Sequence, residues 1–296
     1  MDRPVEAEEE IKETVDETCN QPTKKYRPWV YFLCTYGFTA IFWVSAIFLE
    51  ADMLEFPTII FYILGGLSPS LMGIILTYTT LEKDARKDFW KRSIDFKGIK
   101  LQWYGLILGI NILPTFVAII VGVILGKQGS DFFGSVTFFS SFAILTAIAF
   151  NLIAVVFEEF GWRGYALDGL NNRFGKLGSS VILGTFWCIW HFPLFFISGS
   201  YQNGLGFGSP DFWIFVANIF TLTIIMTWIY FGTNRSILSV LLFHFLTNFL
   251  GEMFELDFML QLIRASVFLV IAFVISVQWI IGFLKERKKV QTGFKQ

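Results

Sequence analysis

Charge is scarce in this sequence, and the scarcity excludes most soluble folds. Only 16% of the 296 residues are charged and 54% are hydrophobic, whereas an ordinary soluble domain carries about 25% charged residues. The three cysteines, Cys19, Cys34 and Cys188, are scattered, so neither a disulfide framework nor a Cys-x-x-Cys metal pair is expected. No basic patch stands apart from the loops that flank apolar runs, which excludes a nucleic-acid-binding protein.

Long apolar runs take the place of charge. Eight of them reach or approach the roughly 20 residues that cross a bilayer as a helix. We expect these spans at Trp29–Leu49, Thr58–Leu81, Leu101–Leu125, Phe138–Phe160, Gly178–Ser198, Phe212–Phe231, Ser236–Phe254 and Phe258–Leu284. The predicted fold class is therefore all-α: a polytopic membrane protein of about eight transmembrane helices that enclose a polar cavity open to the cytoplasm.

Charge also predicts how the chain is divided and oriented. Residues 1–28 form an acidic tail that turns basic at its end and lacks the apolar content to fold alone. Residues 29–284 form one membrane domain, with its functional motifs in 138–254, and residues 285–296 form a basic tail. Alternate loops hold all of the 23 Lys and Arg except Lys127 and Arg264. The positive-inside rule then places both termini in the cytoplasm, in a microbial plasma membrane or an endoplasmic reticulum.

A few polar side chains interrupt the apolar spans, where charge is costly and by default marks a functional site. They are Glu158, Glu159, Arg163, His191, His244 and Asn248, and they include both histidines of the chain. Glu159 and Arg163 are four residues apart, so they can pair if the helix continues. His244 and Asn248 share one helix face for the same reason. A single polar residue of this kind would be interpreted as a hydrogen bond between helices, but six of them on three spans predict a functional site.

These residue types suit hydrolysis within a membrane, which needs a trapped water, a base and donors for the developing oxyanion. Glutamate with histidine supplies the base, and imidazole with a carboxamide supplies the donors. Zinc is the competing interpretation, with Glu158, His191 and His244 as its ligands, although the sequence has no His-Glu-x-x-His motif. We favour a site without a cofactor, because the carboxylate and imidazole pair already accounts for the chemistry.

Three further polar residues rank lower as site residues. Asn151 lies seven residues before Glu158 on the same face and is expected to support it. Glu252 continues the face of His244 towards the outer end of its span. Arg264 is expected to extend outward to the interface.

The three motifs Glu158-Glu159-x-x-x-Arg163, Trp187-x-x-x-His191 and His244-x-x-x-Asn248 follow one another on successive spans. In this the sequence resembles the CAAX prenyl protease and bacteriocin-processing family of intramembrane proteases, the type II CAAX endopeptidases, over about Leu101–Leu250. Trp187 stands where phenylalanine is commoner in that family, and we interpret the position as aromatic packing.

The resemblance implies an endopeptidase that works from the cytosolic side and removes the last three residues of a prenylated C-a-a-X protein. By the family's roles, Glu158 polarises the attacking water and His191 assists it. His244 and Asn248 face the oxyanion, and Glu159 and Arg163 position the site. The implied partners are a prenylated substrate and the lipid bilayer.

Three other functions stay open at this point. Members of the family also process non-prenylated membrane peptides, or act as non-catalytic immunity or scaffold proteins. From another class, a proton-coupled transporter would place Glu, His and Arg in a relay. A transporter predicts pH-driven flux without peptide cleavage, and a scaffold predicts that Glu158 can be replaced without effect.

Overall fold

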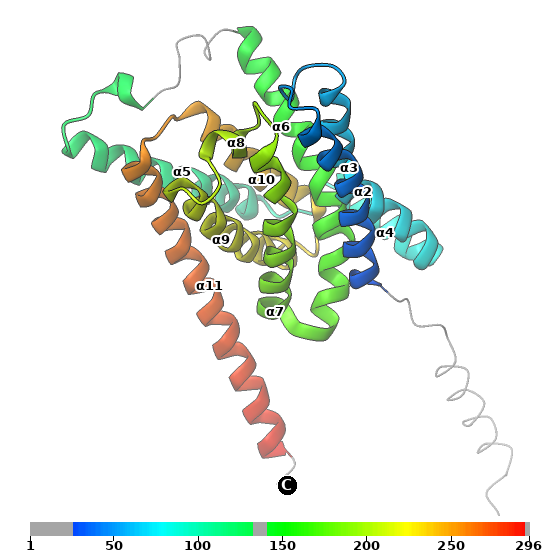
Figure 1. Ribbon diagram of the computed structural model, residues 1–296. Helices are drawn as coiled ribbons and strands as arrows, with labels where there is room; N and C mark the ends of the chain where they lie inside the picture. Colours follow the sequence, from blue (N-terminus) through cyan, green and yellow to red (C-terminus); the bar gives the residue numbers. More distant parts are fainter. Residues whose placement is uncertain (1–25, 133–140, 294–296) are drawn as a thin grey trace, which may run out of the picture.

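The computed structural model describes residues 26–132 and 141–293, and in these ranges the chain is helical without any strand. Figure 1 shows the helices packed into one bundle. The long helices are α2 (Pro28–Phe48), α3 (Thr58–Thr80), α4 (Lys83–Ile94), α5 (Leu101–Ile124), α6 (Ser141–Gly161), α7 (Leu167–Trp190), α9 (Pro210–Gly232), α10 (Ile237–Met253) and α11 (Phe258–Gly293). Shorter turns are η1 (Gly129–Asp131), the π-helical η3 (Trp162–Ala166), η4 (Phe192–Phe196) and α8 (Tyr201–Leu205).

The predicted class, an all-α polytopic membrane protein, is confirmed. Six stretches of the described chain are long and apolar enough to cross a membrane. One of them, Phe142–Phe196, holds two of the predicted spans, and the shorter apolar helix α10 corresponds to another. Gly175 separates the two crossings of Phe142–Phe196 because its backbone (φ 66°, ψ 179°) leaves the helical region. Every predicted span therefore has its own helix.

Most helix bounds lie within a few residues of the prediction, but three differ. The fifth span ends at Trp190 rather than Ser198, because Pro193 cannot continue an α-helix and the chain enters η4. The basic segment after the second span, expected to be a loop, is largely the helix α4. The last helix runs on to Gly293 rather than ending at Leu284. The predicted start of the fourth span, Phe138, and residues 1–25 of the predicted tail lie outside the described residues.

The packing of α3 against α6 fixes the end of α6, where the predicted site begins. A Cβ on Gly161 would lie 2.1 Å from the carbonyl oxygen of Pro69 and 2.3 Å from the hydroxyl of Tyr31. A Cβ on Gly73 of α3 would in turn lie 2.6 Å from the Cα of Gly161. Only residues without a side chain allow this backbone approach. It holds the last turn of α6 against α2 and α3.

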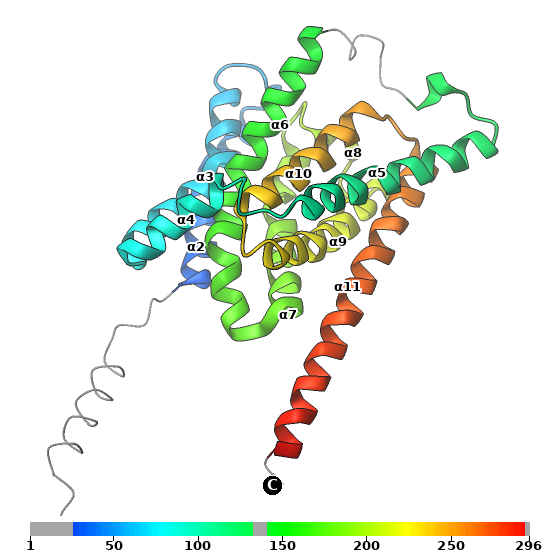
Figure 2. The same ribbon diagram turned by 180° about the vertical axis from the view of Figure 1, so that it is seen from behind.

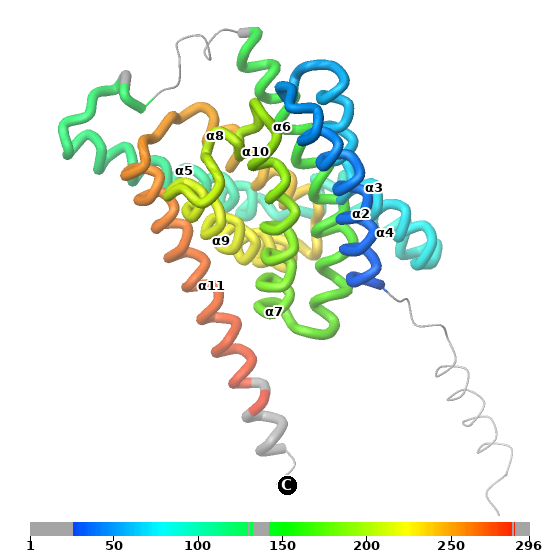
Figure 3. The backbone as a smooth tube through the Cα atoms, viewed as in Figure 1, coloured from blue at the N-terminus to red at the C-terminus, as the bar shows by residue number. Residues whose placement is uncertain are grey.

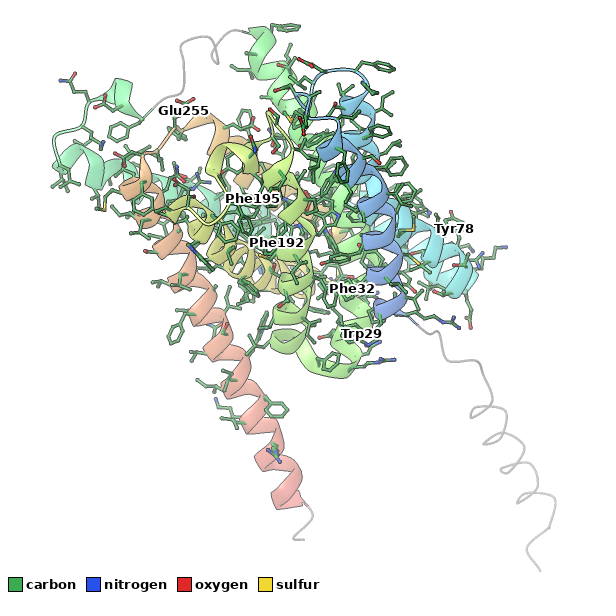
Figure 4. All side chains as sticks on the ribbon, in the orientation of Figure 1. Trp29, Phe32, Tyr78, Phe192, Phe195 and Glu255 are labelled. Carbon is green, nitrogen blue, oxygen red and sulfur yellow. The ribbon has the colours of Figure 1, made fainter. Side chains whose placement is uncertain are left out.

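The outer surface of the bundle is apolar, as a lipid environment requires. Phe116, Phe142 and Phe273 are each more than half exposed, although a soluble monomer rarely shows wide apolar surface. Figure 4 shows the aromatic side chains of Phe192 and Phe195 inside the bundle, and those of Trp29 and Tyr78 at its periphery. The chain is therefore an integral membrane protein.

The bundle places α10 at its centre, and the start of α2 and the end of α11 on one side. Helix α10 packs between α5 and α6, and α11 contacts α5 and α9 (Figure 2). Helix α2 begins, and α11 runs out, at the same end of the molecule (Figure 3). The opposite end holds the connection from α10 to α11, where Glu255 lies exposed (Figure 4). Which end faces the cytoplasm stays a prediction, as does the cavity open to it.

A charged cluster ties together segments that are far apart in the sequence. Asp168 of α7 accepts hydrogen bonds from the hydroxyl groups of Tyr230 (3.0 Å) and Tyr26 (3.3 Å) and from Arg235. The guanidinium of Arg92 on α4 lies 3.7 Å from the same carboxylate. Burial, with the nearby Asp168 carboxylate, raises the pKa of Tyr26 to about 12, so this phenol stays a donor at neutral pH. The cluster joins α4, α7 and the connection between α9 and α10.

Candidate active site

The carboxylates of the site come from the last turn of α6, immediately before the helix widens into the π-helical turn η3. Such π-turns inside α-helices occur frequently at functional sites. Here the π-helical turn carries Arg163. Gly161, which lies between the two glutamates and Arg163 in the sequence, packs against α3. Glu158 and Glu159 are 9% and 0% exposed, and Arg163 is 0% exposed. The sequence therefore buries three ionisable groups within two turns.

Glu159 and Arg163 neutralise each other, and Glu159 also contacts His244 on α10. Arg163 donates from Nη1 to Oε1 of Glu159 at 2.8 Å, so the predicted pairing is confirmed. The same oxygen accepts from Nδ1 of His244, also at 2.8 Å. Breaking a buried pair by removing one partner is strongly destabilising, because the other charge is left uncompensated. Glu159 thus orients both Arg163 and His244, and Glu158 is left with a different neighbour.

That neighbour is Trp187 of α7. Its indole Nε1 donates to Oε2 of Glu158 at 2.5 Å, and its backbone carbonyl accepts from Nδ1 of His191 at 2.8 Å. The ring faces the guanidinium of Arg163 at 4.6 Å and meets the ring of His244 edge-on at 5.4 Å. The side chain expected only to pack therefore contacts the carboxylate, the guanidinium and both imidazoles of the site. The missed signal was the residue type, because a buried indole N–H usually has a partner.

Both histidines are held in the same tautomer. A carbonyl and a carboxylate can only accept, so the Nδ1 of His191 and the Nδ1 of His244 each carry a proton. The opposite ring nitrogen, Nε2, has no hydrogen-bond partner among the described residues in either case. A neutral imidazole in this form can take a proton at Nε2, and an imidazolium can donate from it. Each ring therefore offers one nitrogen for chemistry.

Asn248 lies one turn beyond His244 on α10 and is partly exposed. Within the described part of the chain its carboxamide makes no hydrogen bond, so it is available to a ligand. Its neighbour Thr247 is engaged instead, donating to Oδ1 of Asn111 at 2.7 Å. The structure therefore places the six predicted residues on α6, η3, the end of α7 and α10.

The three lower-ranked residues form contacts of their own. Asn151 donates to Oε2 of Glu252 at 2.9 Å, so it supports Glu252 rather than Glu158, its expected partner. Arg264 does not extend outward as expected. Its Nη2 donates to the carbonyl of Thr247 at 3.3 Å, which turns the guanidinium towards α10. The expectation failed because neighbouring helices offered a partner that sequence spacing does not show.

The residues do not fit the competing zinc site. Among the described residues, no three His, Cys, Asp or Glu side chains come together closely enough to hold a metal ion. The three proposed ligands thus do not converge, and no step of the mechanism below passes through a metal.

Fold and site together define a class: an integral membrane protein with a buried Glu and His site. Comparison with known proteins agrees. Residues 140–250, which include all six site residues, match the family model of the type II CAAX prenyl endopeptidases, Rce1-like. The chain is also 30% identical over 252 residues to the CAAX prenyl protease 2 of Methanococcus maripaludis, covering 84% of this chain and 92% of that protein.

The chain belongs to the CAAX prenyl protease 2 family. It is accordingly a membrane peptidase.

Proposed function

We propose that the protein is an intramembrane endopeptidase that removes the C-terminal aaX tripeptide from prenylated CAAX proteins. The main observation in support of this proposal is the set of side chains around Glu158. This buried carboxylate accepts one fixed N–H from Trp187, and the same indole ring contacts the two imidazoles. The name of the Methanococcus maripaludis relative supports the prenylated substrate.

In the proposed reaction Glu158 is the general base. Its Oε2 is held by Trp187, which leaves Oε1 to take a proton from the attacking water. The water oxygen bonds to the scissile carbonyl carbon, and the carbonyl oxygen becomes the oxyanion. His191 assists through Nε2, and the proton held by Glu158 then passes to the leaving amine as the C–N bond breaks. The products are the shortened protein with a new carboxylate and the free tripeptide.

The proposed oxyanion donors are His244 and Asn248. With Nδ1 bonded to Glu159, His244 donates from Nε2 only as an imidazolium. Oε1 of Glu159 orients this ring by accepting from its Nδ1, and Arg163 donates to the same oxygen. The carboxamide N–H of Asn248 is the second donor. Removing one donor of this kind typically lowers kcat by about 10²–10³.

The experiment incubates the purified protein with a farnesylated CAAX peptide, with and without a chelator, and measures the released tripeptide by mass spectrometry. The proposal predicts tripeptide at the same rate in both samples. Release that stops with chelator and returns with zinc would contradict the metal-free mechanism. No release at all, with pH-driven flux in liposomes, would support the transporter.

A further inference from the structure

Arg264 lies in the second turn of α11, inside a stretch apolar enough to cross a membrane. Its Nη2 donates to the carbonyl of Thr247 on α10 at 3.3 Å. Its two Nη atoms lie 3.6 and 3.7 Å from the place that a Cβ would take on Gly251. In the described part of the chain, no carboxylate pairs with this guanidinium.

A guanidinium in this position is unusual without an anion. Arginines within membrane spans normally pair with a carboxylate or line a polar path. Arg163 follows that rule, with Glu159 at 2.8 Å. For Arg264, a single carbonyl at 3.3 Å is at the long end of hydrogen-bond distances. The rest of its five-donor fork is available to a ligand, and the planar fork suits a carboxylate best.

The distance from the reacting residues to Arg264 matches the length of the leaving tripeptide. His244, Asn248 and Gly251 recur on one face of α10, and the helix rises about 10 Å from His244 to Gly251. Three residues of extended peptide also span about 10 Å. Along this face the residues become more accessible, from buried His244 through partly exposed Asn248 to exposed Gly251.

We propose that Arg264 binds the C-terminal carboxylate of the substrate peptide. With the scissile carbonyl at His244 and Asn248, the third residue beyond it ends beside Gly251, next to the guanidinium of Arg264. Because this contact fixes the distance between the C-terminus of the substrate and the reacting residues, it sets the cleavage point three residues from the end of the substrate. This inference rests on the proposed endopeptidase function.

The test compares two farnesylated peptides of one sequence, one ending in a free carboxylate and one in a carboxamide. A hydrogen-bonded charge pair of this kind corresponds to a preference of about 10- to 100-fold in kcat/KM for the free acid in the wild type. In Arg264→Gln the ratio of the two kcat/KM values falls towards one. Because the ratio is measured within one protein preparation, partial misfolding of the variant does not change it.

Two control variants sharpen the result. Arg264→Lys keeps the charge without the fork, so an intermediate ratio is expected. Lys127→Gln removes a cation that pairs with Asp257, and it leaves the wild-type ratio unchanged. Equal cleavage of both peptides by the wild type would overturn the proposal, and so would an unchanged ratio in Arg264→Gln. Failure of the proposed function is distinct, because the wild type would then release tripeptide from neither peptide.

Discussion

At the scale of single residues, the site depends on an indole N–H. Trp187 is the only donor that the described residues offer to Glu158, and its carbonyl fixes the tautomer of His191. The sequence predicted the six polar residues because charge in an apolar span is conspicuous. The role of Trp187 was missed because the position was interpreted as aromatic packing, although tryptophan, unlike phenylalanine, carries an N–H that needs a partner. The sequence could not show that Asn151 pairs with Glu252, a partner on another helix.

Trp187→Phe tests this role. Phenylalanine keeps a ring among Arg163 and the two histidines but removes the N–H from Glu158. A hydrogen bond to a charged group is worth about 1.5–3 kcal/mol, so kcat should fall about 10- to 100-fold with KM little changed. The measurement is steady-state cleavage of a farnesylated CAAX peptide.

The matched control is Trp190→Phe, which removes another buried indole N–H. That group donates to Thr39 at 2.9 Å and does not touch Glu158. A Trp187→Phe enzyme with the kcat of Trp190→Phe would show that the hydrogen bond to Glu158 is not used.

At the scale of helices, the apolar runs predicted the spans well because the bilayer sets their length. The helix bounds differ from the prediction where polarity, a proline or close helix packing, rather than the thickness of the bilayer, determines the structure. Helix α4 is too polar to be a membrane span, so apolar run length gave no signal for it. Helix α7 ends early because Pro193 follows it. The close contact of α3 with α6 depends on Gly73 and Gly161, and a glycine in a sequence does not show which helix it will contact.

Gly161→Ala tests that contact. The new Cβ would meet the backbone oxygen of Pro69, which cannot rotate away as a side chain would. Overpacking of this kind costs about 1–3 kcal/mol, so the unfolding midpoint in detergent should fall. In Gly105→Ala of α5 the Cβ meets nothing within 4 Å. That control should be neutral or stabilised by about 0.5–1 kcal/mol, and equal midpoints in both variants would refute the account of the α3–α6 contact.

Asp168→Asn tests the cluster that joins α4, α7 and the connection between α9 and α10. The change removes one of the two carboxylates that Arg92 and Arg235 share, and it leaves Asp88 as their partner. Loss of one partner from a buried pair costs about 3–5 kcal/mol, so a clear fall in the thermal unfolding midpoint is expected. Asp84→Asn removes an exposed carboxylate that faces Lys87 at 4.0 Å, and such pairs contribute about 0–1 kcal/mol. A midpoint for Asp168→Asn as high as that of Asp84→Asn would show that the cluster does not hold these helices.

At the scale of the whole molecule, charge predicts an orientation that labelling can test. The loops that hold most of the Lys and Arg, together with the start of α2, are expected to face the cytoplasm. In a chain with Cys34 and Cys188 replaced by alanine, a membrane-impermeant maleimide added to intact cells should not label Cys19. It should label a cysteine introduced as Gly129→Cys, at the exposed turn η1. The opposite pattern would invert the topology and place the site's access on the other side.

The central claim concerns the carboxylate of Glu158, and one measurement addresses it directly. Glu158→Gln keeps the shape of the side chain and can still meet Trp187, but it cannot take a proton from water. The purified variant and the wild type are compared for tripeptide release from a farnesylated CAAX peptide and for thermal unfolding midpoint. We predict no detectable tripeptide from the variant and a midpoint close to that of the wild type. Turnover at the wild-type rate by the folded variant would contradict the assignment of Glu158 as the base.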